Sequence, residues 1–145
     1  LKAGSTHLPF RDQGARVAHL HGHCHQKAFA AMGAVEATLR AIPGLDVRPI
    51  ESSCCGMSGA FGYGAETMDV SLAMAELSLL PAVRKAGRAE LIVADGTSCR
   101  HQIHDGTGRV ALHVVRVLDM ALAHDAPAPE DMAPDDPARD DRAGS

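Results

Sequence analysis

The segment "AELIVAD", residues 89–95, is an almost unbroken apolar run. A run of this kind is typical of a strand in a parallel sheet whose two faces are both covered. It is followed by "SCRHQIHDGTG", residues 98–108, which begins with Ser98 as a candidate helix N-cap and ends in turn-forming residues. The centre of the chain therefore predicts a buried strand that leads directly into a helix.

The same strand-then-helix order recurs toward the N-terminus. "RVAHLHGH" (16–23) alternates and predicts a strand, and "QKAFAAMGAVEATLRAI" (26–42) predicts a helix. "DVRPI" (46–50) predicts a short strand, and Pro49 either makes it an edge strand or moves its end, because proline cannot donate to a neighbouring strand. The apolar face of the helix over 26–42 consists of Phe29, Met32, Val35, Leu39 and Ile42.

Two further pairs of elements complete the pattern. Residues 65–80 predict a helix with Met68, Leu72, Ala75 and Leu79 at helical spacing, and Pro81 should kink it before it continues to about residue 86. Residues 109–115 predict a strand, and 116–124 predict the last helix. This alternation predicts an α/β fold, in which Rossmann-like βαβ repeats build a four-stranded, mostly parallel sheet with helices on both faces.

Composition indicates one globular domain. Hydrophobic residues make up 46% of the 145 residues and charged residues 22%, and the net charge of -4 does not favour nucleic-acid binding. No apolar run is long enough for a transmembrane helix. We expect residues 1–14 to be a lead-in that continues from an upstream domain, and 15–124 to be one domain. The segment 125–145, rich in Pro, Asp and Ala, should be a disordered acidic tail.

The four cysteines all follow predicted strands. Cys24 follows the first strand, Cys54 and Cys55 follow the second, and Cys99 follows the third. Open α/β sheets bind ligands beyond the carboxyl ends of their strands, so these thiols should converge there. Four thiolates suit a [4Fe–4S] cluster or tetrahedral zinc. The alternative is that each cysteine is simply a small buried apolar residue.

Three neighbouring residues are further candidates for this site. Gly56 should give the turn after the paired cysteines its backbone freedom. Three helix N-termini should converge on the thiols, and their partial positive charge favours thiolates and an anionic cluster. Lys27 and Arg100 lie in predicted first helical turns, where an anionic group nearby would offset the unfavourable placement of a cation.

Four histidines alternate along the first strand. His19, His21, His23 and His25 could form a metal-binding face. We interpret His19 and His21, on the body of the strand, as lining a crevice or donating hydrogen bonds behind a site. His23 and His25 flank Cys24 at the strand end and are the better candidates for contacting a cofactor.

Three motifs carry a resemblance to a known family. "HGHCHQKA", "SSCCGMSGAFGY" and "DGTSCRHQI" resemble the cysteine-rich CCG domains of heterodisulfide reductase B subunits, anaerobic glycerol-3-phosphate dehydrogenase C subunits and iron–sulfur subunits of glycolate and lactate oxidases. They look most like the C-terminal part of FAD-linked oxidases of 2-hydroxy acids. The resemblance spans about residues 15–120 and implies that Cys24, Cys54, Cys55 and Cys99 are ligands of an iron–sulfur cluster. Some members have a fifth cysteine where this chain has Gln102, which leaves open whether Gln102 or a histidine replaces it.

The resemblance implies an electron-transfer module, either a component or a C-terminal fragment of an oxidoreductase. Its partner would be an FAD-containing domain or subunit that oxidises a 2-hydroxy acid or glycerol 3-phosphate, and the electrons would pass to a quinone or another carrier. We expect a cytoplasmic location, with any contact with the inner face of the membrane made through partners. One alternative is a zinc-binding structural or docking domain without redox activity. Another is thiol chemistry at a cysteine activated by a helix N-terminus.

Overall fold

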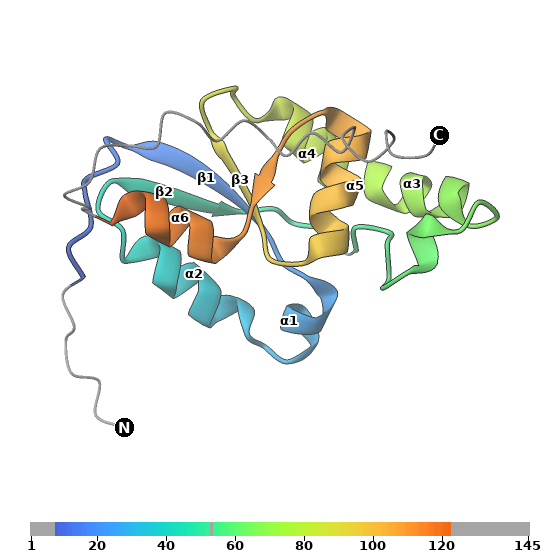
Figure 1. Cartoon of the computed structure of the whole chain (residues 1–145), viewed down its shortest axis with the longest axis horizontal. Coiled ribbons are helices and arrows are strands. Elements are labelled where there is room, and N and C mark those ends of the chain that lie inside the picture. Colours follow the sequence, from blue (N-terminus) through green and yellow to red (C-terminus); the bar gives the residue numbers. More distant parts are fainter. Residues whose placement is uncertain (1–7, 53, 123–145) are drawn as a thin grey trace, which may run out of the picture.

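Four parallel strands form the centre of the computed structural model, which describes residues 8–52 and 54–122 (Figure 1). They are β1 (Arg16–His21), β2 (Leu45–Pro49), β3 (Leu91–Ala94) and β4 (Ala111–Leu112). Their order in the sheet is β2-β1-β3-β4, and every neighbouring pair is parallel. The predicted α/β class and parallel sheet are confirmed. The predicted disordered tail lies outside the described residues.

The register makes β1 and β3 the central strands. Ala18 of β1 pairs with Val47 on one side and with Leu91 on the other. β2 lies at an edge, as Pro49 at its end predicted. The carboxyl ends of β2, β1 and β3 are therefore adjacent, which brings the loops that follow them to one edge of the sheet.

The alternation of side chains along the strands divides the core in two. Ala18, Leu20, Leu91 and Val93 point toward α2 (Met32–Arg40) and α6 (Val114–Ala121). Ile92 and Ala94 point to the other face, where α4 (Leu79–Lys85) and α5 (Thr97–Thr107) cover the sheet (Figure 1). Helices on both faces are thus confirmed, and the even-numbered residues of β3 face the same layer as the cysteine loops.

The helix predicted over 26–42 is two helices. α1 (Cys24–Ala28) is short, and α2 starts only at Met32. Ala30 between them has a left-handed backbone with φ of 53°, which turns the chain from the edge of the sheet onto its face. Phe29, expected on the buried helical face, is 73% exposed, whereas Leu39 and Ile42 at the other end of that face are buried as predicted.

The break in the next helical segment is also earlier than predicted. α3 (Met68–Glu76) ends before α4, and Pro81 lies in the first turn of α4 rather than at a kink. The first four N–H groups of a helix have no partner within it, so proline is tolerated there. Met68, expected on the apolar face, is 50% exposed.

Three boundaries near the C-terminal end differ from the sequence expectation. α5 begins at Thr97 with Gly96 as its N-cap, so Ser98 is the second residue of the helix and not its cap. β4 has two residues in place of the seven predicted over 109–115, because His113 caps α6 with its side chain and ends the strand early. Near the other terminus, Phe10 forms an isolated antiparallel bridge with Leu122, which ties the lead-in to this domain.

Candidate metal centre

The four cysteines come from the three adjacent loops, as predicted. Cys24 is the first residue of α1, directly after β1 and a two-residue turn, and Cys99 is the third residue of α5 after β3. Cys54 and Cys55 lie in the irregular segment that follows β2. That segment leads into a single 3₁₀ turn, Phe61–Tyr63, so two helix N-termini reach the cysteines and not the three expected.

The thiols form two close pairs. In the outer pair, Sγ of Cys24 lies 3.3 Å from Sγ of Cys54, and both residues are partly exposed. In the inner pair, Sγ of Cys99 lies 3.2 Å from Sγ of Cys55, and these residues are 0% and 2% exposed. All four cysteines are free thiols. The adjacent residues Cys54 and Cys55 therefore pair with different cysteines. As a result, all four sulfurs lie close to the Cys54–Cys55 segment.

A pocket of about 340 Å³ opens beside the thiols. Cys24 from the outer pair and Cys55 from the inner pair both line it. The remaining lining residues are His23, His25, Ala28, Ser58, Gly59 and Ser98. One cysteine of each pair thus borders the same hollow at the carboxyl edge of the sheet.

The backbone around the cysteine doublet is closely packed. Gly56 has a φ of +87°, and a Cβ there would lie 2.1 Å from the carbonyl oxygen of Ser71. The N–H of Gly56 donates to Sγ of Cys54 over 3.3 Å. Glycine is therefore required here both by its conformation and by the close approach of α3.

Gln102 holds the same loop from the other side. Its Nε2 donates to the carbonyl oxygen of Cys55 over 3.0 Å, and to the carbonyl and hydroxyl oxygens of Ser71 over 3.2 and 3.0 Å. The side chain is buried between α5, α3 and the doublet. Gln102 thus supports the backbone of Cys55, and its amide nitrogen is directed at oxygens rather than at the thiols.

Electrostatics distinguishes the two thiols of the inner pair. The hydrogen bond from Cys99 lowers the pKa of Cys55 to about 4, with the adjacent His21 ring and the backbone N–H of Met57 acting in the same direction against the effect of burial. The hydrogen bond to Cys55, together with burial, raises the pKa of Cys99. The pair thus forms one thiolate and one thiol, and a bound cation would displace the remaining proton.

The thiol of Cys24 differs from that of Cys55. Burial raises the pKa of Cys24, and the neighbouring Cys54 raises it further, while the positive charge of Lys27 acts in the opposite direction. Cys24 therefore holds its proton more strongly than Cys55 does.

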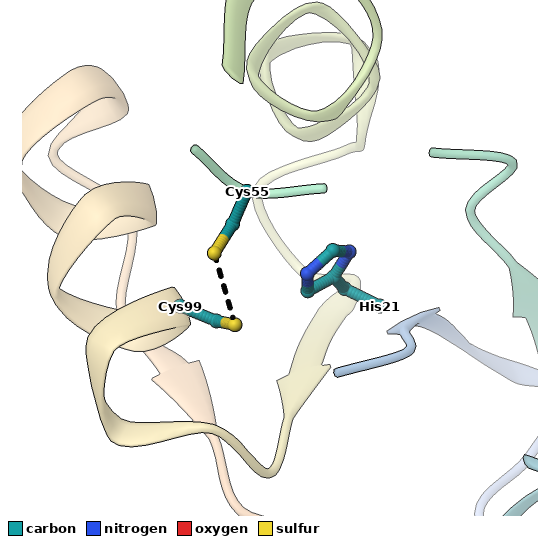
Figure 2. Close-up of side chains that lie close together, drawn as sticks. All are labelled: His21, Cys55 and Cys99. Carbon is teal, nitrogen blue, oxygen red and sulfur yellow. Dashed lines mark hydrogen bonds between the residues drawn. The ribbon is translucent and has the colours of Figure 1, made fainter. Parts of the chain in front are cut away.

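His21 completes a group with the inner pair (Figure 2). It is the last residue of β1 and is 1% exposed, and its ring lies beside the sulfurs of Cys55 and Cys99. One ligand atom from each of the three residues lies within 4.8 Å of the others. From its place on the body of the strand, His21 was expected to line a crevice or to donate hydrogen bonds behind a site. One feature of the sequence indicated this contact. His21 is the last residue of the strand, on the face that it shares with His19.

The other predicted residues hold the loops in place. His23 caps α1 by accepting a hydrogen bond from the N–H of His25 over 3.3 Å, and both rings line the pocket. Lys27 Nζ donates to the carbonyl oxygen of Ser52. Arg100 donates to the carbonyl oxygens of Ala94 and Asp95 over 3.1 and 2.7 Å. A cofactor-binding role for these four residues stays a prediction.

The carboxylate of Asp95 links α1, the helix that carries Cys24, to the start of α6. Oδ2 of Asp95 accepts a hydrogen bond from Nε2 of Gln26 in α1 over 2.6 Å. Oδ1 of the same residue accepts from the N–H of Val114, at the start of α6, over 3.0 Å. Gln26 also accepts from the N–H of His23 and so completes the capping box of α1. This network fixes the helix that begins with Cys24.

Comparison with known proteins shows similarity to two dehydrogenases. The chain is 32% identical over 123 residues to the C subunit of the anaerobic glycerol-3-phosphate dehydrogenase of Escherichia coli (strain K12), an alignment that covers 85% of this chain and 30% of that protein. It is 33% identical over 98 residues to D-2-hydroxyglutarate dehydrogenase of the same strain, covering 67% of this chain and 10% of that protein. The chain thus spans about a third or less of the relatives that it matches. No family model and no solved structure matches it significantly.

These similarities link the chain to redox enzymes, as the sequence motifs predicted. Its cysteine-rich group has the chemistry of a metal site, with sulfur and nitrogen donors gathered at one point. Among the helices in residues 8–52 and 54–122, none is sufficiently long and apolar to span a bilayer.

Proposed function

We propose that this domain is an iron–sulfur electron-transfer module of a flavin-linked dehydrogenase. The observation that carries the proposal is the convergence of four free thiols, from three loops, at the edge of a parallel sheet where such folds bind ligands. Residues so far apart in sequence share this place only through the fold. Four cysteines are the ligand set of a [4Fe–4S] cluster.

The residues fit such a group. The lowered pKa of Cys55 supplies one thiolate, and His21 has a ring nitrogen in the same buried space without a hydrogen-bond partner among the described residues. Cys24, Cys54, Cys55 and Cys99 would hold the cluster, which when bound would supply one-electron transfer. The chain itself would shield its inner face from water through the burial of Cys55 and Cys99, and would leave the outer pair open toward a partner.

The partner we propose is an FAD-containing dehydrogenase domain or subunit. The two relatives suggest two substrate classes, because their names specify glycerol 3-phosphate and D-2-hydroxyglutarate. A flavin would accept the electrons from either substrate, and the module would pass them to a quinone or another carrier. We propose a cytoplasmic location, with any membrane contact made through that partner.

A zinc-binding docking domain is the second candidate, and one observation favours it. The group of His21, Cys55 and Cys99 combines sulfur and imidazole donors, a set that suits tetrahedral zinc. Zinc has no redox chemistry, so the domain would then shape or dock a neighbouring subunit.

Nucleophilic thiol chemistry is not favoured by the arrangement of the cysteines. Cys55, whose pKa is lowered, is only 2% exposed. Cys24, which is more accessible, has a raised pKa. A reactive cysteine combines a low pKa with exposure, and neither residue does so.

The experiment is to purify the chain without oxygen and measure its metal content and visible absorption. We expect iron and sulfide, a brown colour, and bleaching by dithionite. Cys55→Ser should abolish the colour, whereas Ser58→Ala, a change at the rim of the same pocket, should retain it. A colourless protein with one equivalent of zinc would overturn the electron-transfer function and leave the docking domain.

A further inference from the structure

The imidazole of His21 is buried with one nitrogen unpaired. The residue is 1% exposed, and among the residues that the structure describes its Nε2 has no hydrogen-bond partner. Buried polar atoms of native proteins nearly always have a partner, so an exception of this kind calls for a ligand or a bound group. Figure 2 shows the ring beside the sulfurs of Cys55 and Cys99.

We propose that Nε2 of His21 is a ligand of the metal centre, beside Sγ of Cys55 and Cys99. This inference rests on the proposed metal-binding function, and it adds a nitrogen ligand to the four cysteines. The sequence left open whether Gln102 or a histidine replaces the fifth cysteine of some family members. The inference gives that role to His21, because Gln102 is already directed at the oxygens of Cys55 and Ser71.

The other ring nitrogen is held in the manner of a metal-binding histidine. Nδ1 of His21 lies 2.8 Å from Oγ of Ser52. When Nδ1–H donates to that hydroxyl, the lone pair of Nε2 is left facing the thiols, and such a partner commonly fixes the tautomer of a ligating histidine. Lys27 donates to the carbonyl oxygen of Ser52 and so restrains this residue.

The distances suit a single zinc ion, and on a [4Fe–4S] cluster the same three atoms would bind neighbouring irons. The ligand atoms of His21, Cys55 and Cys99 lie within 4.8 Å of one another. Tetrahedral bonds of about 2.0–2.3 Å place ligand atoms roughly 3.3–3.8 Å apart, so only small side-chain rotations are needed. The three residues come from β1, the loop after β2 and the start of α5, so that the arrangement is held by three separate segments.

His19 offers a matched comparison. It lies two residues earlier on β1 and faces the same side of the sheet. Its Nε2 lies 2.8 Å from Oε2 of Glu90, so its ring already has a partner. Two histidines with the same position relative to the sheet thus differ in what they meet, and only His21 meets sulfur.

The test uses the whole chain, purified without oxygen, and a readout chosen by the metal it contains. If the metal is iron, pulsed electron paramagnetic resonance of the reduced protein, grown with ¹⁵N-histidine, should show the coupling of a directly bound nitrogen. If the metal is zinc, X-ray absorption should show a nitrogen at about 2.0–2.1 Å beside sulfur at about 2.3 Å. His21→Asn should remove the nitrogen signal, and His19→Asn should retain it.

The outcomes separate this inference from the proposed function. Iron with a histidine nitrogen supports both, and zinc with a histidine nitrogen supports His21 while overturning electron transfer. Iron or zinc with sulfur alone overturns the role of His21, and a chain that takes up neither metal overturns both. Should His21→Asn fail to fold, the labelled wild type still reports the nitrogen, and retention of the signal in His23→Asn and His25→Asn excludes the two histidines that line the pocket.

Discussion

The inner pair, Cys55 and Cys99, and the outer pair, Cys24 and Cys54, have almost the same sulfur–sulfur distance but different surroundings. The inner pair is buried among the core residues of α4, α5 and β3, and Gln102 and His21 contact its loop or its sulfurs. The outer pair lies at the rim, where Cys24 begins a five-residue helix. The hydrophobic core thus holds the inner pair in place before any metal binds, whereas helix capping and hydrogen bonds hold the outer pair.

The largest effect on metal binding is expected when one thiol of the inner pair is replaced. Cys55→Ser should weaken metal binding by at least ~100-fold, beyond the ~10–100-fold cost of losing an outer-shell contact, because the rigid core cannot supply another ligand. Cys24→Ser should weaken metal binding about tenfold, because the short helix α1 can adjust to let water or serine reach the metal. Metal titration of both variants gives the two affinities, and equal losses would show that the pairs are equivalent.

Gly56→Ala should be the most damaging change near the doublet that removes no donor. The added Cβ meets Ser71 O at 2.1 Å with φ of +87°, so we expect a loss of about 2–4 kcal/mol in the free energy of unfolding. Gly59→Ala is the control, since φ there is +71° with no atom within 4 Å, and should cost only about 1–2 kcal/mol. Urea unfolding of the apo-proteins measures both, and similar values would refute the importance of the contact with α3.

Two glutamines, one beside each pair of cysteines, allow a second test of the difference between the pairs. Gln102→Met leaves the buried oxygens of Cys55 and Ser71 without a donor and should cost about 1–3 kcal/mol. Gln26→Met removes the capping box and the contact with Asp95 and should cost about 0.5–2 kcal/mol. Thermal unfolding gives the order of the two, and metal retention should fall more for Gln102→Met. The reverse order would mean that the outer pair is the better supported one.

The smallest effect is expected at the pair of His19 and Glu90, away from both cysteine pairs. The hydrogen bond with His19 lowers the pKa of Glu90 from 4.5, so its stabilisation is present above that pH and is lost as the pH falls through the lowered pKa. Glu90→Gln should therefore be slightly less stable than the wild type at pH 7 and equal to it in strong acid. Urea midpoints across this range check the sign, and a difference that persists in strong acid, where Glu90 is protonated, would contradict it.

The sheet and the loops that carry the cysteines were predictable because they depend on local patterns. The apolar run at 89–95 indicated a buried parallel strand, and Pro49 indicated an edge strand. Parallel strands bring the residues that follow them to one edge of the sheet. The breaks at Ala30 and before Pro81 were not predictable, because they depend on where the chain must turn to cover the sheet.

Within the site, the pairing of thiols and the role of His21 depended on tertiary contacts. Adjacent residues such as Cys54 and Cys55 would have been expected to act together, yet each faces a cysteine from a different strand loop. His21 was one of four alternating histidines, and only packing against α5 and the doublet distinguishes it from His19. Alternation reports the face of a strand, not what covers that face.

The origin of the donors from three separate loops has a consequence for the order of assembly. Cys24 and Cys99 are separated by 75 positions, and the only donors close in sequence to the doublet are its own two sulfurs. No single stretch of the unfolded chain thus carries all four cysteines, in contrast with short cysteine motifs that capture a metal before the rest of the domain forms. Loop closure between β1 and β3 must precede metal capture, so during synthesis the centre can be filled only after residue 99 has left the ribosome and joined the sheet.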